Sequence, residues 1–200
     1  MKRLAILLSG RGSNFEAIAD NVAAGNLAAE IAIVIANRPE ARGLEVARQR
    51  GLPAVCIPSK ALDRNIYDGM LADELKKHAV DLVCLAGYMR LLSAGFIREF
   101  PGRVLNIHPS LLPSFPGLDA QHQALEHGVK VTGCTVHFVD EYLDAGPIIV
   151  QAAVPVRDGD TVETLSARIL SQEHRIYSEA IRMVLSGTLR IEGRRVLGGL

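Results

Sequence analysis

Short apolar runs alternate with longer amphipathic segments along the first half of the chain. The apolar runs cover residues 4–8, 31–36, 54–57 and 82–86. Uninterrupted runs of this length are typical of strands that are buried on both faces. The intervening segments, at residues 14–24, 43–50 and 65–78, are compatible with helices. This alternation predicts an α/β fold in which a mostly parallel, Rossmann-like sheet carries helices on both faces.

The pattern changes in the second half of the chain. Residues 103–107 predict another strand, and residues 131–140 and 147–156 predict a strand pair joined by the turn Asp144-Ala145-Gly146-Pro147. Residues 161–185 carry apolar side chains at helical spacing, so they predict one long helix with Asp160 or Thr161 as its N-cap. We therefore expect an antiparallel addition to the parallel sheet, followed by a frayed tail at residues 194–200.

Length and charge narrow the class of protein. The chain has 200 residues, which fits a single domain at residues 1–200. Its 22 basic and 22 acidic side chains give a net charge of zero, so no bulk positive field favours nucleic acid or an anionic membrane. The longest apolar run has six residues, against the roughly 20 that a membrane span needs, and the N-terminal apolar stretch is too short for a secretory signal.

The cysteines point to a reducing compartment. Cys56, Cys84 and Cys134 are odd in number, and each lies in an apolar segment typical of a strand. This pattern favours reduced thiols packed as small hydrophobic side chains, and hence a cytoplasmic protein. The sequence has no Cys-x-x-Cys motif or Cys/His ligand spacing, so no metal site is expected.

A glycine-rich turn, Ser9-Gly10-Arg11-Gly12-Ser13-Asn14, joins the first predicted strand to the first predicted helix. Backbone N–H groups in such a turn can approach a phosphate, and the helix N-terminus adds its positive end. Phe15 stands where a dinucleotide fingerprint needs its third glycine, so a monophosphate fits better than a dinucleotide. The alternative is an ordinary turn in which Ser13 or Asn14 caps the helix.

Other candidate residues for chemistry lie in the second half. Asn106 and His108 end a predicted strand, where both side chains can donate hydrogen bonds to one developing oxyanion; a purely structural histidine is the alternative. The acidic segment 140–146 can orient His108 or be a solvated turn. His137 can reach this site or pack in the core. Glu173 lies on the apolar stripe of the last helix, which points to a ligand amine or a buried pair, unless it lies at the helix edge and reaches water.

Four motifs together resemble the phosphoribosylglycinamide formyltransferase family, the folate-dependent transformylases of purine synthesis. They are Gly12-Ser13-Asn14, residues 86–92, residues 106–113, and residues 136–139 with 144–147. The resemblance covers about residues 1–184 and implies the formyltransferase fold, with a nucleotide-binding half at about 1–100 and a catalytic, folate-binding half at about 101–187. It also implies 10-formyltetrahydrofolate as co-substrate, small-molecule substrates, no metal or ATP, and a monomer or homodimer.

By this resemblance, Asn106, His108 and Asp144 would be catalytic. The ribonucleotide would be held by Gly12, Ser13, Asn14 and Glu173. The residues around the folate would be Arg64, Met89, Arg90, Leu91, Leu92, Asn106, Asp140, Glu141, Tyr142, Leu143 and Asp144. The chain departs from the family at residues 118–122, where histidines are frequent, and this puts only an accessory histidine at position 119 or 121 in doubt.

Three alternatives stay open at this point. A formyltetrahydrofolate hydrolase or a tRNA formyltransferase resembles the chain around Asn106, His108 and Asp144, although each usually carries a further domain. The zero net charge also disfavours a tRNA substrate. A non-catalytic module would bind a nucleotide at residues 12–14 and use His108 only structurally.

Overall fold

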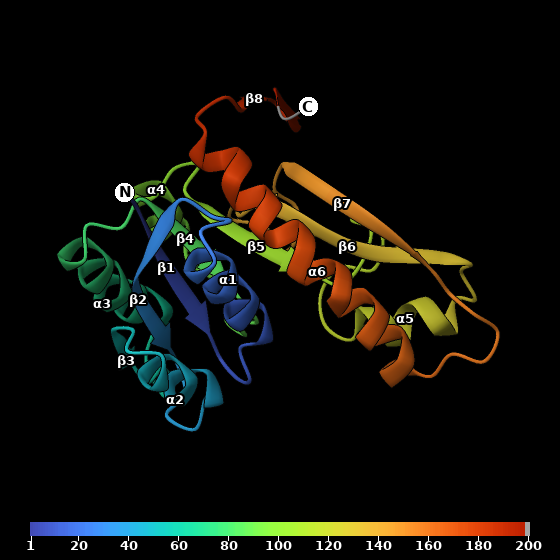
Figure 1. Cartoon of the computed structure of the whole chain (residues 1–200), viewed down its shortest axis with the longest axis horizontal. Coiled ribbons are helices and arrows are strands. Elements are labelled where there is room, and N and C mark those ends of the chain that lie inside the picture. The colour runs from blue at the N-terminus through green and yellow to red at the C-terminus, as the bar shows by residue number, and fades with distance from the viewer. Residues whose placement is uncertain (199–200) are drawn as a thin grey trace. The chain divides into compact units, whose positions relative to one another are not determined.

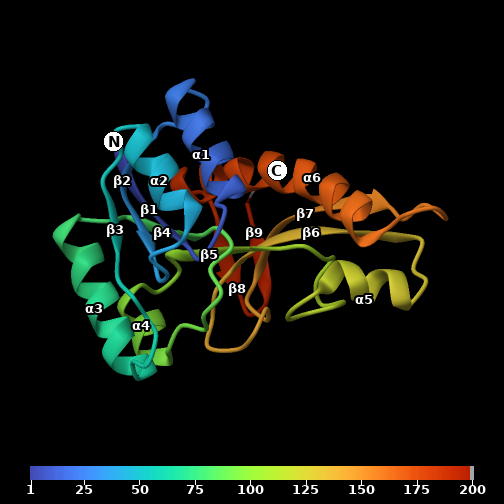
Figure 2. The same ribbon diagram turned by 90° about the horizontal axis from the view of Figure 1, so that it is seen from below.

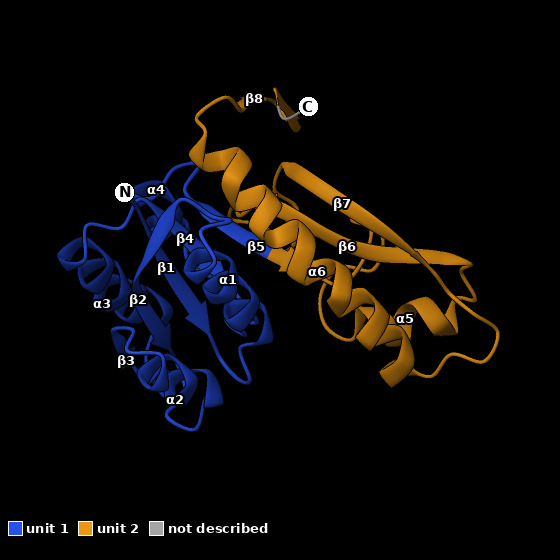
Figure 3. Ribbon diagram, viewed as in Figure 1, with its two compact units in different colours: residues 1–106 blue, residues 107–200 orange. Residues whose placement is uncertain are grey.

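The computed structural model describes residues 1–198 and divides into two compact units. Unit 1 is Met1–Asn106 and unit 2 is Ile107–Leu200 (Figure 3). Strand β5, Val104–His108, runs across this boundary. The organisation of the chain as one domain stays a prediction.

Unit 1 is built on a parallel sheet with the strand order β3-β2-β1-β4-β5 (Figure 1). Its strands are β1 Lys2–Leu8, β2 Ala29–Ala36, β3 Ala54–Cys56, β4 Leu82–Leu85 and the start of β5. The helices are α1 Ser13–Ala23, α2 Arg42–Gln49, α3 Arg64–Lys77 and α4 Ala94–Glu99. Figure 2 shows α1 and α2 on one face of the sheet and α3 and α4 on the other. The predicted α/β class is confirmed.

Unit 2 is built on an antiparallel strand pair, β6 Val131–Phe138 and β7 Ile148–Pro155. The long helix α6, Val162–Leu185, packs against both strands and also contacts the short helix α5, Ala120–Glu126. Thr161 caps α6 through a reciprocal pair of hydrogen bonds with Thr164. The predicted antiparallel addition is therefore confirmed, and Thr161 is the cap rather than Asp160.

The prediction of a frayed tail is wrong for the residues that the structure describes. Arg190–Glu192 and Arg195–Leu197 form the antiparallel strands β8 and β9. Gly193 has a φ of +59°, a backbone conformation that a glycine adopts at little cost, and it makes the turn between them. Arg195 of β9 also pairs with Ile148 of β7, so the tail gains ladder contacts. The last part of the predicted tail, residues 199–200, lies outside the described residues.

The sheet forms the core, as its sequence predicts. The strands β1 and β2 are almost fully buried from Leu4 to Leu8 and from Ile31 to Ala36. Cys84 and Cys134 are buried free thiols, and desolvation raises the pKa of Cys134 to about 12, so both pack as neutral apolar groups. Within residues 1–198, no helix has the length and apolar character to cross a membrane.

Candidate active site

The end of β5 carries the two residues that sequence reasoning singled out. Asn106 and His108 are two positions apart on this strand, so their side chains leave the same face. His108 is buried, with 5% of its surface exposed. The placement follows from the sequence, because the apolar Val104 and Leu105 are buried within the sheet and the polar residues follow at its carboxyl edge.

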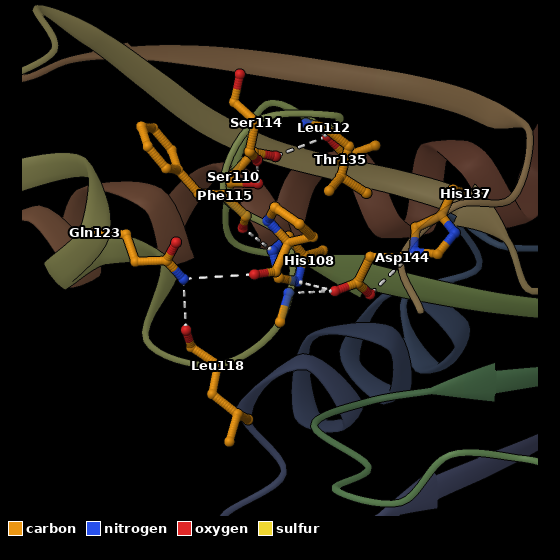
Figure 4. A network of polar contacts seen from close by, with 12 residues as sticks. His108, Ser110, Leu112, Ser114, Phe115, Leu118, Gln123, Thr135, His137 and Asp144 are labelled. Atoms are coloured by element: carbon orange, nitrogen blue, oxygen red, sulfur yellow. Dashed lines mark hydrogen bonds and ion pairs between the residues drawn. The ribbon is translucent and has the colours of Figure 1, made fainter. Parts of the chain in front are cut away.

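The His108 ring contacts an acceptor at each of its nitrogens (Figure 4). Nδ1 lies 3.3 Å from Oδ2 of Asp144. Nε2 lies 2.8 Å from the carbonyl oxygen of Phe115. A carboxylate and a carbonyl can only accept, so only the imidazolium form, with a proton on both nitrogens, satisfies both partners at once.

Asp144 is held at this place by its backbone and by a second donor. Its φ is +49°, in the left-handed region that aspartate tolerates better than most residues. Oδ2 accepts a hydrogen bond of 2.8 Å from the backbone N–H of Gly117, and only 9% of the side chain is exposed. The carboxylate is therefore fixed in position and shielded from water, which strengthens its attraction for a cation.

His137 approaches the same carboxylate from strand β6. Its Nδ1 donates to the carbonyl of Phe138 at 2.8 Å, so Nε2 faces Asp144, 3.8 Å from Oδ1 (Figure 4). Burial lowers the pKa of His137 below its ordinary value, and this outweighs the opposing attraction of Asp144. The structure thus brings His137 to the site, and Asp144 has one imidazole near each oxygen.

A second network holds the turn that follows His108. The hydroxyl of Thr135 donates to the carbonyl of Ser110 at 2.7 Å and accepts from the backbone N–H of Leu112 at 3.0 Å. Gln151 on β7 donates to this hydroxyl and to the carbonyl of Leu112, at 2.9 Å each. Sequence reasoning placed Thr135 on the same strand face as His137 but gave it no role, and it missed Gln151 and Phe115. The contact of Phe115 is made by its backbone carbonyl, which leaves no signal in the residue type.

In unit 1, the glycine-rich turn leads directly into α1. The N-cap of α1 is Gly12 with a φ of +81°, and no side chain caps the helix, so the prediction of Ser13 or Asn14 as cap is wrong. Those two residues lie inside the first helical turn, where their side chains cannot reach forward as a cap does. A Cβ at Gly12 would come within 3.3 Å of Gly43 Cα and of a Leu8 methyl. The turn therefore presents a helix N-terminus that no side chain caps, a geometry suited to an anion.

The remaining predicted residues of unit 1 lie in two segments. Met89 and Leu91 are exposed while Leu92 is buried. The guanidinium of Arg90 stacks over the ring of Tyr67, 4.7 Å from its centroid. Arg64 is the first residue of α3 and is exposed.

Two predicted segments belong to unit 2. The acidic segment begins with Asp140, whose carboxylate accepts from the backbone N–H of Tyr142 at 2.9 Å. Glu141, Tyr142 and Leu143 are exposed, so only Asp144 of this segment joins the buried cluster. Glu173 on α6 is 7% exposed, so the interpretation of a helix-edge residue that reaches water is wrong.

The remaining histidines and acids form no metal centre. Residues 1–198 contain no group of three or more His, Cys, Asp or Glu side chains arranged to hold an ion. His122 is exposed and lies 3.5 Å from Glu126, one turn along α5. The polar cluster of unit 2 is therefore a proton-bearing site rather than a metal site.

Comparison with known proteins identifies the family. The family model described as formyl transferase matches residues 2–181, which is most of the chain. The chain belongs to the formyl transferase family. This formyl transferase is 44% identical over 189 residues to the phosphoribosylglycinamide formyltransferase of Escherichia coli, covering 94% of this chain and 89% of that protein. The resemblance expected from the sequence motifs is thus confirmed.

Two further relatives bear on its function. The formyl transferase is 49% identical over 190 residues to the human trifunctional purine biosynthetic protein adenosine-3, covering 94% of this chain but only 19% of that protein. The crystal structure of glycinamide ribonucleotide transformylase 1 from Symbiobacterium toebii superposes with a TM-score of 0.96 at 57% identity, over 98% of this chain and 93% of that one. A formyltetrahydrofolate deformylase from Pseudomonas syringae gives a TM-score of 0.92 at 29% identity, with 98% and 65% covered.

Proposed function

We propose that this formyl transferase moves the formyl group of 10-formyltetrahydrofolate to the free amine of glycinamide ribonucleotide. The products are formylglycinamide ribonucleotide and tetrahydrofolate, a step of de novo purine synthesis. The buried pair of His108 and Asp144 at the end of β5 is the observation that carries this proposal. The names of the Escherichia coli and Symbiobacterium toebii relatives support the choice of substrate.

The chemistry follows from the donors at the end of β5. The substrate amine attacks the formyl carbon, a C–N bond forms, and negative charge develops on the formyl oxygen. The Asn106 amide and the His108 imidazolium would donate hydrogen bonds to that oxygen, and each such donor is worth about 10²–10³ in turnover. The bond from the formyl carbon to N10 of the folate then breaks, and the proton lost by the amine passes to N10, directly or through water.

Asp144 would keep His108 oriented and charged during this step. Its carboxylate is 3.3 Å from Nδ1 and is itself fixed by the Gly117 N–H. Because Asp144 occupies the Nδ1 side, Nε2 is the nitrogen that would reach the oxyanion. The Phe115 carbonyl now accepts from Nε2 at 2.8 Å, so the formyl oxygen would take its place as the substrates bind.

The ribonucleotide would be bound through its phosphate and its amine end. The uncapped N-terminus of α1 supports a role for Gly12, Ser13 and Asn14 in holding the phosphate. The buried carboxylate of Glu173 supports a contact with the glycinamide or ribose end.

The folate would use residues of both units. The set proposed in unit 1 is Arg64, Met89, Arg90, Leu91, Leu92 and Asn106, and that in unit 2 is Asp140, Glu141, Tyr142, Leu143 and Asp144. Exposed apolar side chains such as Met89, Leu91 and Tyr142 suit the flat ring system of a pterin. The reaction as written balances without a metal ion or ATP. Small-molecule substrates only, a cytoplasmic location, and a monomer or homodimer complete the proposal.

A turnover assay with glycinamide ribonucleotide and 10-formyltetrahydrofolate, read by product mass, tests this function. Formylated ribonucleotide that is lost with His108→Ala supports it. Formate released without ribonucleotide product points to a hydrolase, an outcome that the structural similarity to the deformylase makes worth measuring. Nucleotide binding by the folded protein with no reaction and no folate binding indicates a non-catalytic module.

A further inference from the structure

A charged groove of about 660 Å³ lies at the carboxyl ends of the strands of unit 1. Three cations line it, Arg38, Lys60 and Arg90, against the single carboxylate of Glu40. Met89 forms part of the same wall, whereas the glycine-rich turn at residues 10–14 does not line the groove. The groove is thus continuous with the segment proposed for the folate and separate from the turn proposed for the phosphate.

Arg90 has hydrogen-bonding capacity that the protein leaves unused. Its Nη1 and Nη2 contact the carbonyls of Ser59 and Leu62 at 3.5 and 3.3 Å, both long for a hydrogen bond. Among residues 1–198, its buried Nε has no hydrogen-bond partner. A guanidinium held by an aromatic ring on one face and by long contacts at its edge is well prepared to take a carboxylate.

The floor of the groove is rigid. Asn37, which is 5% exposed, accepts from the Ser9 hydroxyl at 2.6 Å and donates to the Ser59 hydroxyl at 3.1 Å. The Ser9 hydroxyl also accepts from the backbone N–H of Met89 at 2.8 Å. These bonds tie β1, β2 and the segments at residues 59 and 89 together, so the cations of the rim stand on a fixed base.

We propose that this groove binds the γ-linked glutamate chain of a folate, beyond its first glutamate. The inference rests on the proposed function, since it takes a formyl folate as the donor. Each added glutamate brings one carboxylate on a flexible, well-hydrated chain, which suits an open groove with an excess of two positive charges and no aromatic side chain. Arg90 would receive the chain where it enters, and Arg38 and Lys60 would attract the carboxylates that follow.

The test compares 10-formyltetrahydrofolate carrying one glutamate with the same donor carrying five. Two exposed ion pairs predict a KM that is about threefold to tenfold lower for the longer donor at low salt. This advantage should shrink at high ionic strength, because exposed charges are screened. Equal KM values for the two donors with the wild-type protein would overturn the proposal.

Variants localise the effect. Arg38→Ser with Lys60→Ser should bring the ratio of the two KM values close to one. Glu40→Gln should enlarge the ratio, because it removes the one like charge in the groove. Lys77→Ser with Arg98→Ser, on α3 and α4, removes the same charge outside the groove and should leave the ratio unchanged. A loss of the advantage in this control, or a groove variant that changes only the KM of the ribonucleotide, would assign the effect elsewhere and refute the proposal.

Direct binding separates this inference from the proposed function. Titration of the protein with tetrahydrofolate carrying one or five glutamates requires no turnover. If no ribonucleotide is formylated but the longer folate still binds more tightly, and does so through Arg38 and Lys60, the function fails and the groove stands. If turnover occurs but both folates bind equally, the groove fails and the function stands.

Discussion

The Asp144 carboxylate lies 3.3 Å from Nδ1 of His108, and both side chains are more than nine-tenths buried. Their positions are far apart in sequence, and the contact depends on a left-handed backbone at Asp144 and on the N–H of Gly117. A charge pair removed from water in this way loses hydration, and only close geometry and further hydrogen bonds compensate for it. The fold therefore maintains an imidazolium at the end of β5, where an oxyanion would need it.

His108→Ala should lower kcat by about 10²–10³, because one donor to the oxyanion is lost. The fold should survive, as shown by an unchanged circular dichroism spectrum. His122→Ala removes an exposed histidine on α5 and serves as the control, with activity near that of the wild type. Retention of kcat within tenfold in His108→Ala would exclude His108 from the mechanism.

Asp144→Asn should also lower kcat, by about 10²–10⁴, while the KM of the ribonucleotide changes little. Asparagine keeps the shape of the side chain and tolerates the left-handed backbone, so the loss reports the missing charge. Steady-state kinetics measures this split. Asp158→Asn, at an exposed ion pair with Lys130, is the matched control. Full activity in Asp144→Asn would show that His108 needs no anionic partner.

Much of the fold could be predicted, since burial on both faces forces a distinctive pattern. The apolar run at residues 82–86 corresponds to β4, Leu82–Leu85, and the helical pattern at residues 161–185 to α6, Val162–Leu185. Helix α4 and strands β8 and β9 were not predicted. They are short, and β9 owes part of its order to pairing with Ile148, a tertiary contact with no local signal.

The site was predictable only in part. Asn106 and His108 stood out because polar residues end an apolar strand, and residues 140–146 were recognised as a possible partner. The sequence could not show that Asp144 alone of this segment is buried, because that depends on its left-handed backbone and on Gly117. It also could not show the lack of a side-chain cap at α1, since Ser13 and Asn14 are favourable cap residues whose register is set by Gly12.

Gly12→Ala should raise the KM of the ribonucleotide and destabilise the fold by about 1–2 kcal/mol, the cost of an alanine in left-handed backbone. Its methyl group would meet Gly43 Cα and Leu8 at 3.3 Å and shift the turn. Gly25→Ala is a matched control, because Gly25 has a φ of +74° but open space around a Cβ. It should show the same loss of stability with an unchanged KM. An unchanged KM in Gly12→Ala would separate this turn from phosphate binding.

His137 should make the stability of the protein depend on pH. Burial lowers its pKa in the folded state, so near its ordinary value of about 6.5 the unfolded chain binds a proton that the folded protein does not. The unfolded state then holds more protons, and the free energy of unfolding rises with pH across this range and is lost as the pH falls. Urea unfolding at pH 5.5 and 7.5 should show a larger difference for the wild type than for His137→Gln. His122→Gln, at an exposed position, should keep the wild-type difference, and equal differences in all three proteins would contradict a buried neutral His137.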